Sequence, residues 1–204
     1  MRGLYAITDT QLTPDDRLLA AVGAALRGGA RVIQYRDKHS DHPQRLRAAR
    51  ALRMLCEDAD ALLLINDDVE LAAVVGAHGV HLGRHDPDIA TARARLGAQA
   101  IIGVSCYDDL ERARQAAAGG ADYVAFGRFF PSRTKPQAVA APVECLTEAR
   151  AALDLPLVAI GGITPDNGAR LIAAGADLLA VIHGVFGQPD IEAAARHFAD
   201  LFSS

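Results

Sequence analysis

Short apolar runs recur along the 204-residue chain at fairly even intervals, and this regularity limits the possible folds more than any other feature. Most runs are almost continuously apolar, as parallel strands covered on both faces are. The eight runs are residues 4–8, 31–35, 61–65, 79–82, 100–104, 122–126, 157–160 and 178–182. Residues 15–26, 43–57, 108–118 and 143–153, which lie between them, have helical spacing. Eight strands alternating with helices predict an α/β protein with a closed (β/α)8 TIM barrel.

A short glycine turn repeats between predicted helices and strands. It reads RGGA at residues 27–30, AGGAD at 118–122 and AAGAD at 173–177. Glycine there can take the left-handed conformation that ends a helix, so one type of αβ turn is used repeatedly. Predicted helix starts carry a capping residue shortly before a proline, at Thr13, Asp41, Asp86 and Thr164.

The length and hydrophobicity predict a single domain over residues 1–204. Half of the residues are hydrophobic, which suffices for one core, and the length is short for two domains. A doubly wound open sheet is the alternative architecture. It would need fewer strands and a switch point, and no G-x-G-x-x-G motif follows the first predicted strand.

Composition narrows the class of protein. The net charge of −4 and the scarcity of aromatic residues argue against a general nucleic-acid surface. Cys56, Cys106 and Cys145 form no CxxC pair, which indicates reduced thiols rather than a disulfide framework. The N-terminus is too short and polar for a signal peptide, and no apolar run is long enough to span a bilayer. We therefore expect a soluble cytoplasmic protein that binds neither nucleic acid nor membrane.

The pentad of residues 34–38, QYRDK, follows a buried strand and has the composition of an anion site. Alternation along an extended segment places Gln34, Arg36 and Lys38 on one side, and Tyr35 and Asp37 on the other. Arginine offers a rigid fork to phosphate oxygens and lysine a mobile charge. A solvated charged loop is the alternative. The anion site gains support because other predicted strands also end in polar residues, which a barrel would gather at one rim.

Carboxylates at the ends of the third and fourth predicted strands favour a magnesium site. Mg²⁺ is usually held by one or two carboxylates together with phosphate oxygens and water. Asp67 and Asp86 are the predicted ligands, whereas Asp68 is expected to cap the next helix, and capping is also the alternative role of Asp86. Zinc is less favoured although three histidines lie close in sequence, because no cysteine is placed to complete a closed site. These histidines are His78, His81 and His85, and His81 is expected to be a hydrogen-bonded core or rim residue.

Glycines end the seventh and eighth predicted strands, where barrels commonly bind phosphate with backbone amides. They are Gly161-Gly162 and the Gly184 that follows His183. Tight turns alone would also explain them. Together, a cationic site with metal and an amide site suggest that the protein joins two phosphorylated molecules and that pyrophosphate leaves.

Seven segments, taken in order, resemble the thiamine-phosphate synthase (thiamine-phosphate pyrophosphorylase) family along nearly the whole chain. They are QYRDK at 34–38, LLINDDVELA at 63–72, GVHLGRHD at 79–86, IIGVS at 101–105, DYVAFGRFFPSRTK at 122–135, AIGGITPDN at 159–167 and AGADLLAVI at 174–182. The resemblance implies that the substrates are two small molecules, hydroxymethylpyrimidine diphosphate and a thiazole phosphate or its carboxylated precursor. It also implies Mg²⁺ as cofactor.

The resemblance assigns roles residue by residue. The pyrimidine diphosphate would be bound by Gln34, Tyr35, Arg36, Asp37, Lys38, Asn66, Ser105 and Lys135, and the thiazole phosphate by Ser132, Arg133, Thr134, Gly162, Ile182 and His183. Asp67 and Asp86 would bind Mg²⁺. This chain departs from the family at Ser132, where threonine is usual, at His183-Gly184, where Ser-Ala is common, and at Arg128, where proline is expected.

The family mechanism needs no protein nucleophile. The diphosphate leaves first, giving a pyrimidine cation stabilised by its ring amine, and the thiazole nitrogen then attacks. The catalytic set implied is Arg36, Lys38, Ser105 and Lys135, whose cations, with Mg²⁺, stabilise the departing charge. Neither Ser105 nor Cys106 is expected to be a nucleophile, because no His–carboxylate pair is evident beside them.

Two other functions remain as alternatives. A thiazole tautomerase on a related barrel would handle only the thiazole phosphate, with His183 or His85 as acid–base residue. A non-catalytic sensor of phosphate ligands would not need both metal carboxylates and all the cations. The sequence does not fix the oligomeric state, and a homo-oligomer is compatible with it.

Overall fold

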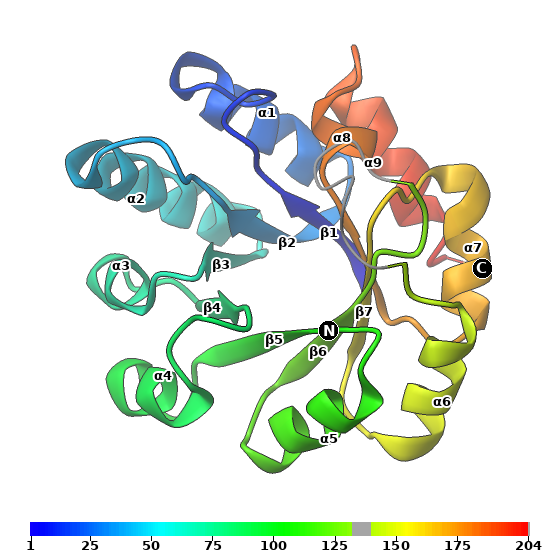
Figure 1. Cartoon of the computed structure of the whole chain (residues 1–204). Coiled ribbons are helices and arrows are strands. Elements are labelled where there is room, and N and C mark those ends of the chain that lie inside the picture. Colours follow the sequence, from blue (N-terminus) through cyan, green and yellow to red (C-terminus); the bar gives the residue numbers. More distant parts are fainter. Residues whose placement is uncertain (132–139, 204) are drawn as a thin grey trace.

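Eight parallel strands form a closed barrel in a computed structural model that describes residues 1–131 and 140–203 (Figure 1). Each strand pairs with its neighbour in sequence, and β8 closes onto β1. The strands are β1 (Gly3–Ile7), β2 (Ala30–Tyr35), β3 (Leu62–Asn66), β4 (Gly79–Leu82), β5 (Ile101–Tyr107), β6 (Tyr123–Phe126), β7 (Leu157–Ile160) and β8 (Leu178–Val181). The predicted (β/α)8 barrel is confirmed, and the open sheet is excluded.

Helices surround the barrel and cover the outer face of its strands (Figure 1). They are α1 (Asp15–Arg27), α2 (His42–Asp58), α3 (Val69–Val75), α4 (Ile89–Leu96), α5 (Leu110–Ala118), α6 (Glu144–Ala152), α7 (Pro165–Ala173), α8 (His183–Phe186) and α9 (Ile191–Asp200). Among the helices of residues 1–131 and 140–203, none combines the length and apolar character that crossing a bilayer requires.

Some of the predicted helix caps are present in the structure. Asp41 accepts a hydrogen bond from the amide of Gln44 in a capping box, and Asp68 caps α3 as predicted. Two predicted caps are wrong. Asp88, not Asp86, accepts from an amide in the first turn of α4, and Thr13 donates its hydroxyl to the carbonyl of Asp9 rather than capping α1. Asp86 is thereby available for another role.

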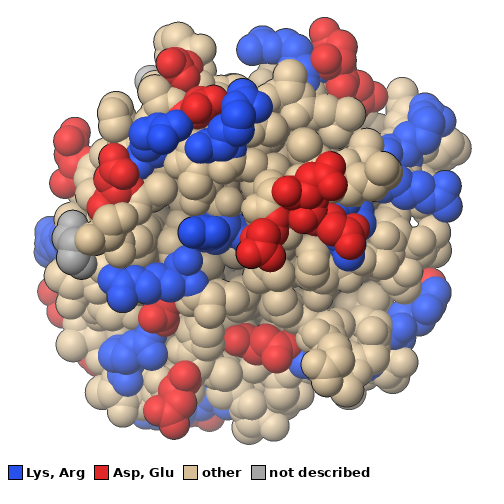
Figure 2. All heavy atoms as spheres, turned by 180° about the vertical axis from the view of Figure 1, so that it is seen from behind, with Lys and Arg blue, Asp and Glu red and all other residues tan. Residues whose placement is uncertain are grey.

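Charged side chains of both signs intermingle on the face shown in Figure 2. Blue and red patches adjoin one another there, and neither sign forms a single broad field. Such a surface fits a protein whose ligand charge is met locally, at a site, rather than by the whole face.

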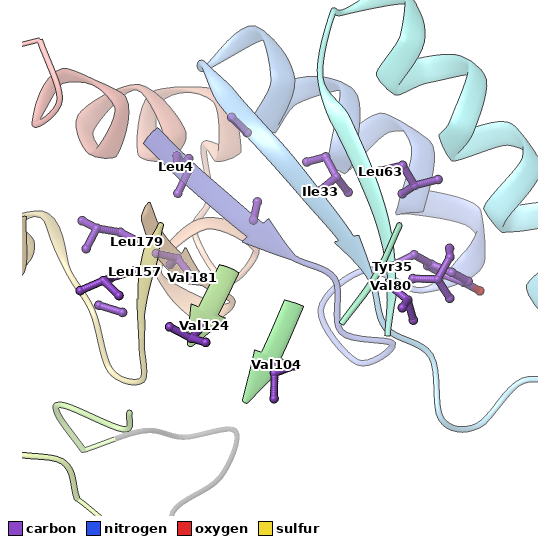
Figure 3. Close-up of a cluster of buried hydrophobic side chains, with 14 of the residues drawn as sticks. Leu4, Ile33, Tyr35, Leu63, Val80, Val104, Val124, Leu157, Leu179 and Val181 are labelled. Atoms are coloured by element: carbon purple, nitrogen blue, oxygen red, sulfur yellow. The ribbon is translucent and has the colours of Figure 1, made fainter. Parts of the chain in front are cut away.

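The core has two parts, one on each face of the barrel wall. The outer cluster lies between strands and helices and includes Leu4, Ile33, Leu63, Val104 and Leu179 (Figure 3). The inner cluster fills the barrel and comprises Tyr5, Ile7, Val32, Leu64, Tyr123, Ala125, Val158, Leu178 and Ala180. Apolar packing on both faces explains why the strands read as nearly continuous apolar runs.

The repeated glycine turn has one geometry at its three sites. The residue after the helix is right-handed and the next is a glycine with positive φ: +98° at Gly29, +88° at Gly120 and +115° at Gly175. L-residues rarely adopt this conformation, so every copy requires glycine at the second position. The first position is right-handed, so alanine can occupy it in the third copy, but in the first copy a Cβ atom at Gly28 would lie 2.4 Å from the carbonyl oxygen of Glu192.

Three residues just before even-numbered strands tie each of them to the preceding odd strand. The side chain of His78 accepts from the amide of Leu63 at 2.8 Å, and Asp122 and Asp177 accept from the amides of Ile102 and Leu157, both at 2.8 Å. Arginines strengthen two of these ties, because Arg93 pairs with Asp122 and Arg150 with Asp177. We call these three connections the strand-pair ties.

Candidate active site at the carboxyl ends of the strands

The pentad 34–38 leaves β2 at the carboxyl-terminal rim of the barrel, and its cations face acidic residues from neighbouring strands. Arg36 Nη1 lies 3.7 Å from Asp9 Oδ2, and Lys38 Nζ lies 3.2 Å from Asp67 Oδ2. The Arg36 amide also donates to the hydroxyl of buried Thr8 at 2.9 Å. Asp9 follows β1 and was missed by the sequence analysis, although a polar residue after the first strand was the available signal.

Tyr35 and Asp37 turn away from the cations, as alternation predicts. Tyr35 is buried in the outer cluster, and its hydroxyl donates to Asp37 Oδ2 at 3.1 Å. Burial raises the pKa of Tyr35 well above its usual value. Burial alone would also raise the pKa of Asp37, but hydrogen bonds from the amides of Ser40 and His39 outweigh it and hold that pKa below the usual range. The pair therefore fixes the shape of the loop that carries Arg36 and Lys38.

Asp67 and Asp86 come together at the exits of β3 and β4. Asp67 has φ of +63°, and its amide donates to the carbonyl of His81 at 2.9 Å. Asp86 Oδ2 accepts from the amide of Gly83 at 2.6 Å. Burial and the neighbouring Asp67 carboxyl raise the pKa of Asp86 despite the opposing effects of the Gly83 amide and of Lys38. The two predicted metal ligands are thus neighbours whose charges repel, as ligands of a shared cation would be.

The donor set fits a magnesium ion that shares its coordination with substrate. In the part of the chain that the structure describes, no group of three or more His, Cys, Asp or Glu side chains could hold a metal. A closed protein site is therefore not formed by these residues. Two carboxylates plus phosphate oxygens and water are the usual surroundings of Mg²⁺ at phosphate-transfer sites.

A hydrogen-bonded chain of side chains runs through the interior of the barrel. Gln34 Nε2 donates to Tyr5 Oη at 2.6 Å, Tyr5 Oη lies 2.9 Å from Tyr123 Oη, His81 Nδ1 lies 2.8 Å from Tyr123 Oη, and His81 Nε2 lies 2.8 Å from Ser105 Oγ. We call these five residues the interior chain. Its ends, Gln34 and Ser105, are two of the predicted pyrimidine-binding residues.

Tyr5 and Tyr123 are the members of the interior chain that the sequence analysis did not find. Both are fully buried, and burial raises the pKa of each well above its usual value. They lie in apolar strands, where a tyrosine is indistinguishable from any other core residue. His81, expected to be a hydrogen-bonded core or rim residue, is confirmed as one.

Arg112 of α5 holds the exits of β4 and β5 together. Its Nε donates to the carbonyl of Ser105 at 2.8 Å, and its Nη2 donates to the carbonyl of Gly83 at 3.3 Å. Ser105 itself lies inside β5, which extends to Tyr107 beyond the predicted end at residue 104. The Gly83 amide in turn positions Asp86, so one arginine supports both Ser105 and a carboxylate.

The exits of β6, β7 and β8 form the other half of the rim. The amides of Phe129 and Phe130 donate to the carbonyls of Ile160 and Gly161, at 3.2 and 3.0 Å. Gly162 has φ of +65°, and a Cβ atom there would lie 2.4 Å from the carbonyl oxygen of Pro131, so only glycine fits. Ile182 precedes α8, and the ring of His183 lies over Gly187, where a Cβ atom would be 2.8 Å from it.

Four predicted site residues, Ser132, Arg133, Thr134 and Lys135, lie outside the described residues. The chain before them reaches the rim at Pro131, beside Gly162. Their assignment therefore stays a prediction.

The cysteines are buried thiols. Burial raises the pKa of Cys106 to about 12, that of Cys56 to about 12 and that of Cys145 to about 11. Such thiols remain protonated near neutral pH and are poor nucleophiles, which agrees with leaving Cys106 out of the chemistry.

A sequence profile of the thiamine monophosphate synthase family matches residues 4–185. The chain belongs to this family. A thiamine-phosphate synthase from Thioalkalivibrio sulfidiphilus is 57% identical over 202 residues, which cover 99% of this chain and 96% of that protein. One from Marinobacter nauticus is 58% identical over 203 residues, covering 98% of this chain and 91% of the other.

Solved structures agree with the family and the fold. Thiamine phosphate pyrophosphorylase from Pyrococcus furiosus superposes with a TM-score of 0.90 at 36% identity, covering 98% of this chain and 95% of that one. Orotidine 5'-phosphate decarboxylase from Pyrococcus horikoshii has a TM-score of 0.70 at 16% identity, covering 98% of this chain and 99% of that one, and shares the barrel fold alone.

Proposed function

We propose that this chain is a transferase that joins 4-amino-5-hydroxymethyl-2-methylpyrimidine diphosphate to a thiazole phosphate, giving thiamine phosphate and pyrophosphate. The observation that carries the proposal is the rim cluster in which Lys38 Nζ lies 3.2 Å from Asp67 Oδ2 and the Asp67 carboxyl lies close enough to Asp86 to raise its pKa. Membership of the family indicates which reaction to expect, and this cluster contains the cation and the carboxylates that the reaction requires.

The diphosphate end of the pyrimidine substrate is assigned to the exits of β2, β3 and β4. Arg36 and Lys38 would contact its oxygens, and Asp67 and Asp86 would hold Mg²⁺, which supplies charge neutralisation for the leaving pyrophosphate when bound. Lys135 is the further cation predicted for this task. Preorganised positive charge stabilises the transition state because negative charge develops on the leaving group.

The pyrimidine ring is assigned to the rim above the interior chain. Gln34 and Ser105 end the interior chain, and Asn66 is the last residue of β3, the strand next to β2 in the barrel. Tyr35 and Asp37 serve this site by holding the loop of Arg36 and Lys38. The residues bind and orient the ring while the carbon–oxygen bond to the diphosphate breaks and the thiazole nitrogen attacks.

The thiazole phosphate is assigned to the opposite half of the rim. Gly162, Ile182 and His183 would provide the phosphate site, together with Ser132, Arg133 and Thr134. We expect the backbone of residues 182–184 to do the binding. The His183 ring packs over Gly187. We expect its side chain to add only a modest attraction to the phosphate.

Mixing both substrates with the protein and Mg²⁺ tests the proposal. We expect thiamine phosphate by mass, pyrophosphate in equal amount, and loss of both when EDTA removes the metal. A thiazole tautomerase would convert the carboxylated thiazole phosphate without the pyrimidine diphosphate, and a non-catalytic sensor would bind ligands without releasing pyrophosphate. Either result would overturn the proposed function.

A further inference from the structure

The interior chain joins side chains from five different strands in one path. Gln34 comes from β2, Tyr5 from β1, Tyr123 from β6, His81 from β4 and Ser105 from β5. Apart from its two ends at the rim, the path lies in the barrel interior among apolar residues. Buried polar groups that are fully hydrogen-bonded hold one another in place.

The barrel makes room for this chain at a specific position. A Cβ atom at Gly103 of β5 would lie 1.8 Å from Cζ of Tyr123, so only glycine admits the phenol. The Tyr123 ring then stacks on His81, with ring centroids 5.6 Å apart and an angle of 21° between the planes. The phenol is therefore positioned by both the strand backbone and the imidazole.

Hydrogen-bond chemistry gives the chain a direction. Each hydroxyl has one proton to donate, and a neutral imidazole has one N–H and one acceptor nitrogen. Gln34 donates to Tyr5. If every remaining proton lies between two members of the interior chain and His81 is neutral, the Tyr5 hydroxyl donates to Tyr123 and the Tyr123 hydroxyl donates to Nδ1 of His81. An imidazole that accepts at Nδ1 carries its proton at Nε2, which then donates to Ser105 Oγ.

We propose that the interior chain fixes His81 as the Nε2–H tautomer and thereby makes the Ser105 hydroxyl a hydrogen-bond donor toward the substrate ring. The amide oxygen of Gln34 is the acceptor at the other end. This inference rests on the proposed function and deepens it by naming what selects the ring. A 4-aminopyrimidine presents an acceptor ring nitrogen beside a donor amine, whereas its 4-oxo counterpart presents the reverse. The donor and acceptor order of the chain therefore selects the amino form, with Tyr123 and Tyr5 as positioning residues.

The tautomer can be read on the unmodified protein by NMR of ¹⁵N-labelled histidine, with His81→Gln to assign the signals. We expect Nδ1 of His81 to show the shift of an unprotonated acceptor and Nε2 that of a protonated donor. The opposite tautomer, with Nδ1 protonated, would reverse the chain and overturn the inference. This measurement does not depend on any variant folding.

Ligand discrimination is the second test. The probes are the monophosphates of 4-amino- and 4-oxo-5-hydroxymethyl-2-methylpyrimidine, which lack the pyrophosphate leaving group, with Kd measured by calorimetry. We expect the protein to prefer the amino form by about 10²-fold or more, because mispaired polar groups in such a site are costly. Tyr123→Phe should reduce this preference by at least about tenfold, because one hydrogen bond that orders the chain is lost.

Tyr107→Phe is the matched control, because it removes a phenol hydroxyl from the strand that carries Ser105. Tyr107 is not a member of the interior chain. It should keep the preference unchanged. A Tyr123→Phe protein that binds both probes more weakly but in the same ratio would show a merely structural role and overturn the inference. If the unmodified protein bound neither probe, the proposed function would fall with it. The KM for thiazole phosphate should stay unchanged in Tyr123→Phe.

Discussion

Removing Arg112 should weaken catalysis without removing any group that touches substrate. Its guanidinium donates to the carbonyls of Ser105 and Gly83, at 2.8 and 3.3 Å. A hydrogen bond to a charged group contributes about 1.5–3 kcal/mol, and one of these two is long, so Arg112→Ala should destabilise the fold by about 2 kcal/mol. For a domain of this size that lowers the Tm by about 4–8 °C.

The effect on activity follows from the two loops that Arg112 holds. Both Ser105 and the Gly83 amide, which positions Asp86, lose a support. A displacement of about 1 Å at a catalytic group costs about 10²-fold, so kcat/KM for the pyrimidine diphosphate should fall by about 10- to 10²-fold. The KM for the thiazole phosphate should change little, because its predicted residues follow β6 to β8.

Steady-state kinetics with each substrate varied in turn would check this, at a temperature well below the Tm of the variant. Arg114→Ala is the control, because Arg114 lies on the same helix with its side chain 54% exposed and pairs only loosely with Glu111, at 3.6 Å. It should alter neither rate nor stability measurably. Full activity in a folded Arg112→Ala protein, or a KM for thiazole phosphate that rises as much as the KM for the pyrimidine diphosphate, would refute the reasoning.

Three further predictions concern the metal, a cation and pH. Asp86→Ala should leave the fold intact and cut turnover about 10²-fold or more, with an altered dependence on added Mg²⁺; full rate in EDTA-treated enzyme would contradict the assignment. Lys135→Ala should slow pyrophosphate release by about 10²-fold, and an effect confined to thiazole phosphate affinity would move Lys135 to the other substrate. Burial and then Arg53 lower the pKa of His78, so the stability that its neutral ring contributes is present above a pH of about 6.5 and is lost as pH falls below this value. His78→Asp should flatten this part of the dependence in urea unfolding from pH 5 to 8, and an unchanged slope would exclude His78 as its source.

The strands and their rim residues could be predicted because parallel strands in a barrel leave a local signature. Apolar runs mark the strands, and the polar residue after each run must lie at the same rim. Asp67, Asp86 and Lys38 were found in this way, and the structure brings them together. The prediction that the fifth strand ends at residue 104 was wrong, because Ser105 and Cys106 continue β5 past the apolar run.

The supports of the site could not be predicted because their contacts join distant parts of the chain. Tyr5 and Tyr123 are 118 residues apart and meet only across the closed barrel. A continuous apolar run does not say which side chains face the interior, so neither tyrosine stood out. Arg112 is one of two arginines on α5, and nothing in the sequence distinguishes the two residues whose carbonyls it contacts.

The strand-pair ties bear on the order in which the molecule assembles. They join residues only 15 or 20 positions apart, at His78 with Leu63, Asp122 with Ile102 and Asp177 with Leu157. Contacts so close in sequence cost little loop-closure entropy and form early. Each βαβ unit can therefore close soon after its second strand leaves the ribosome. The pairing of β1 with β8, where Gly3 meets Leu178, must wait for nearly the whole chain, and we expect it to be the last step of folding.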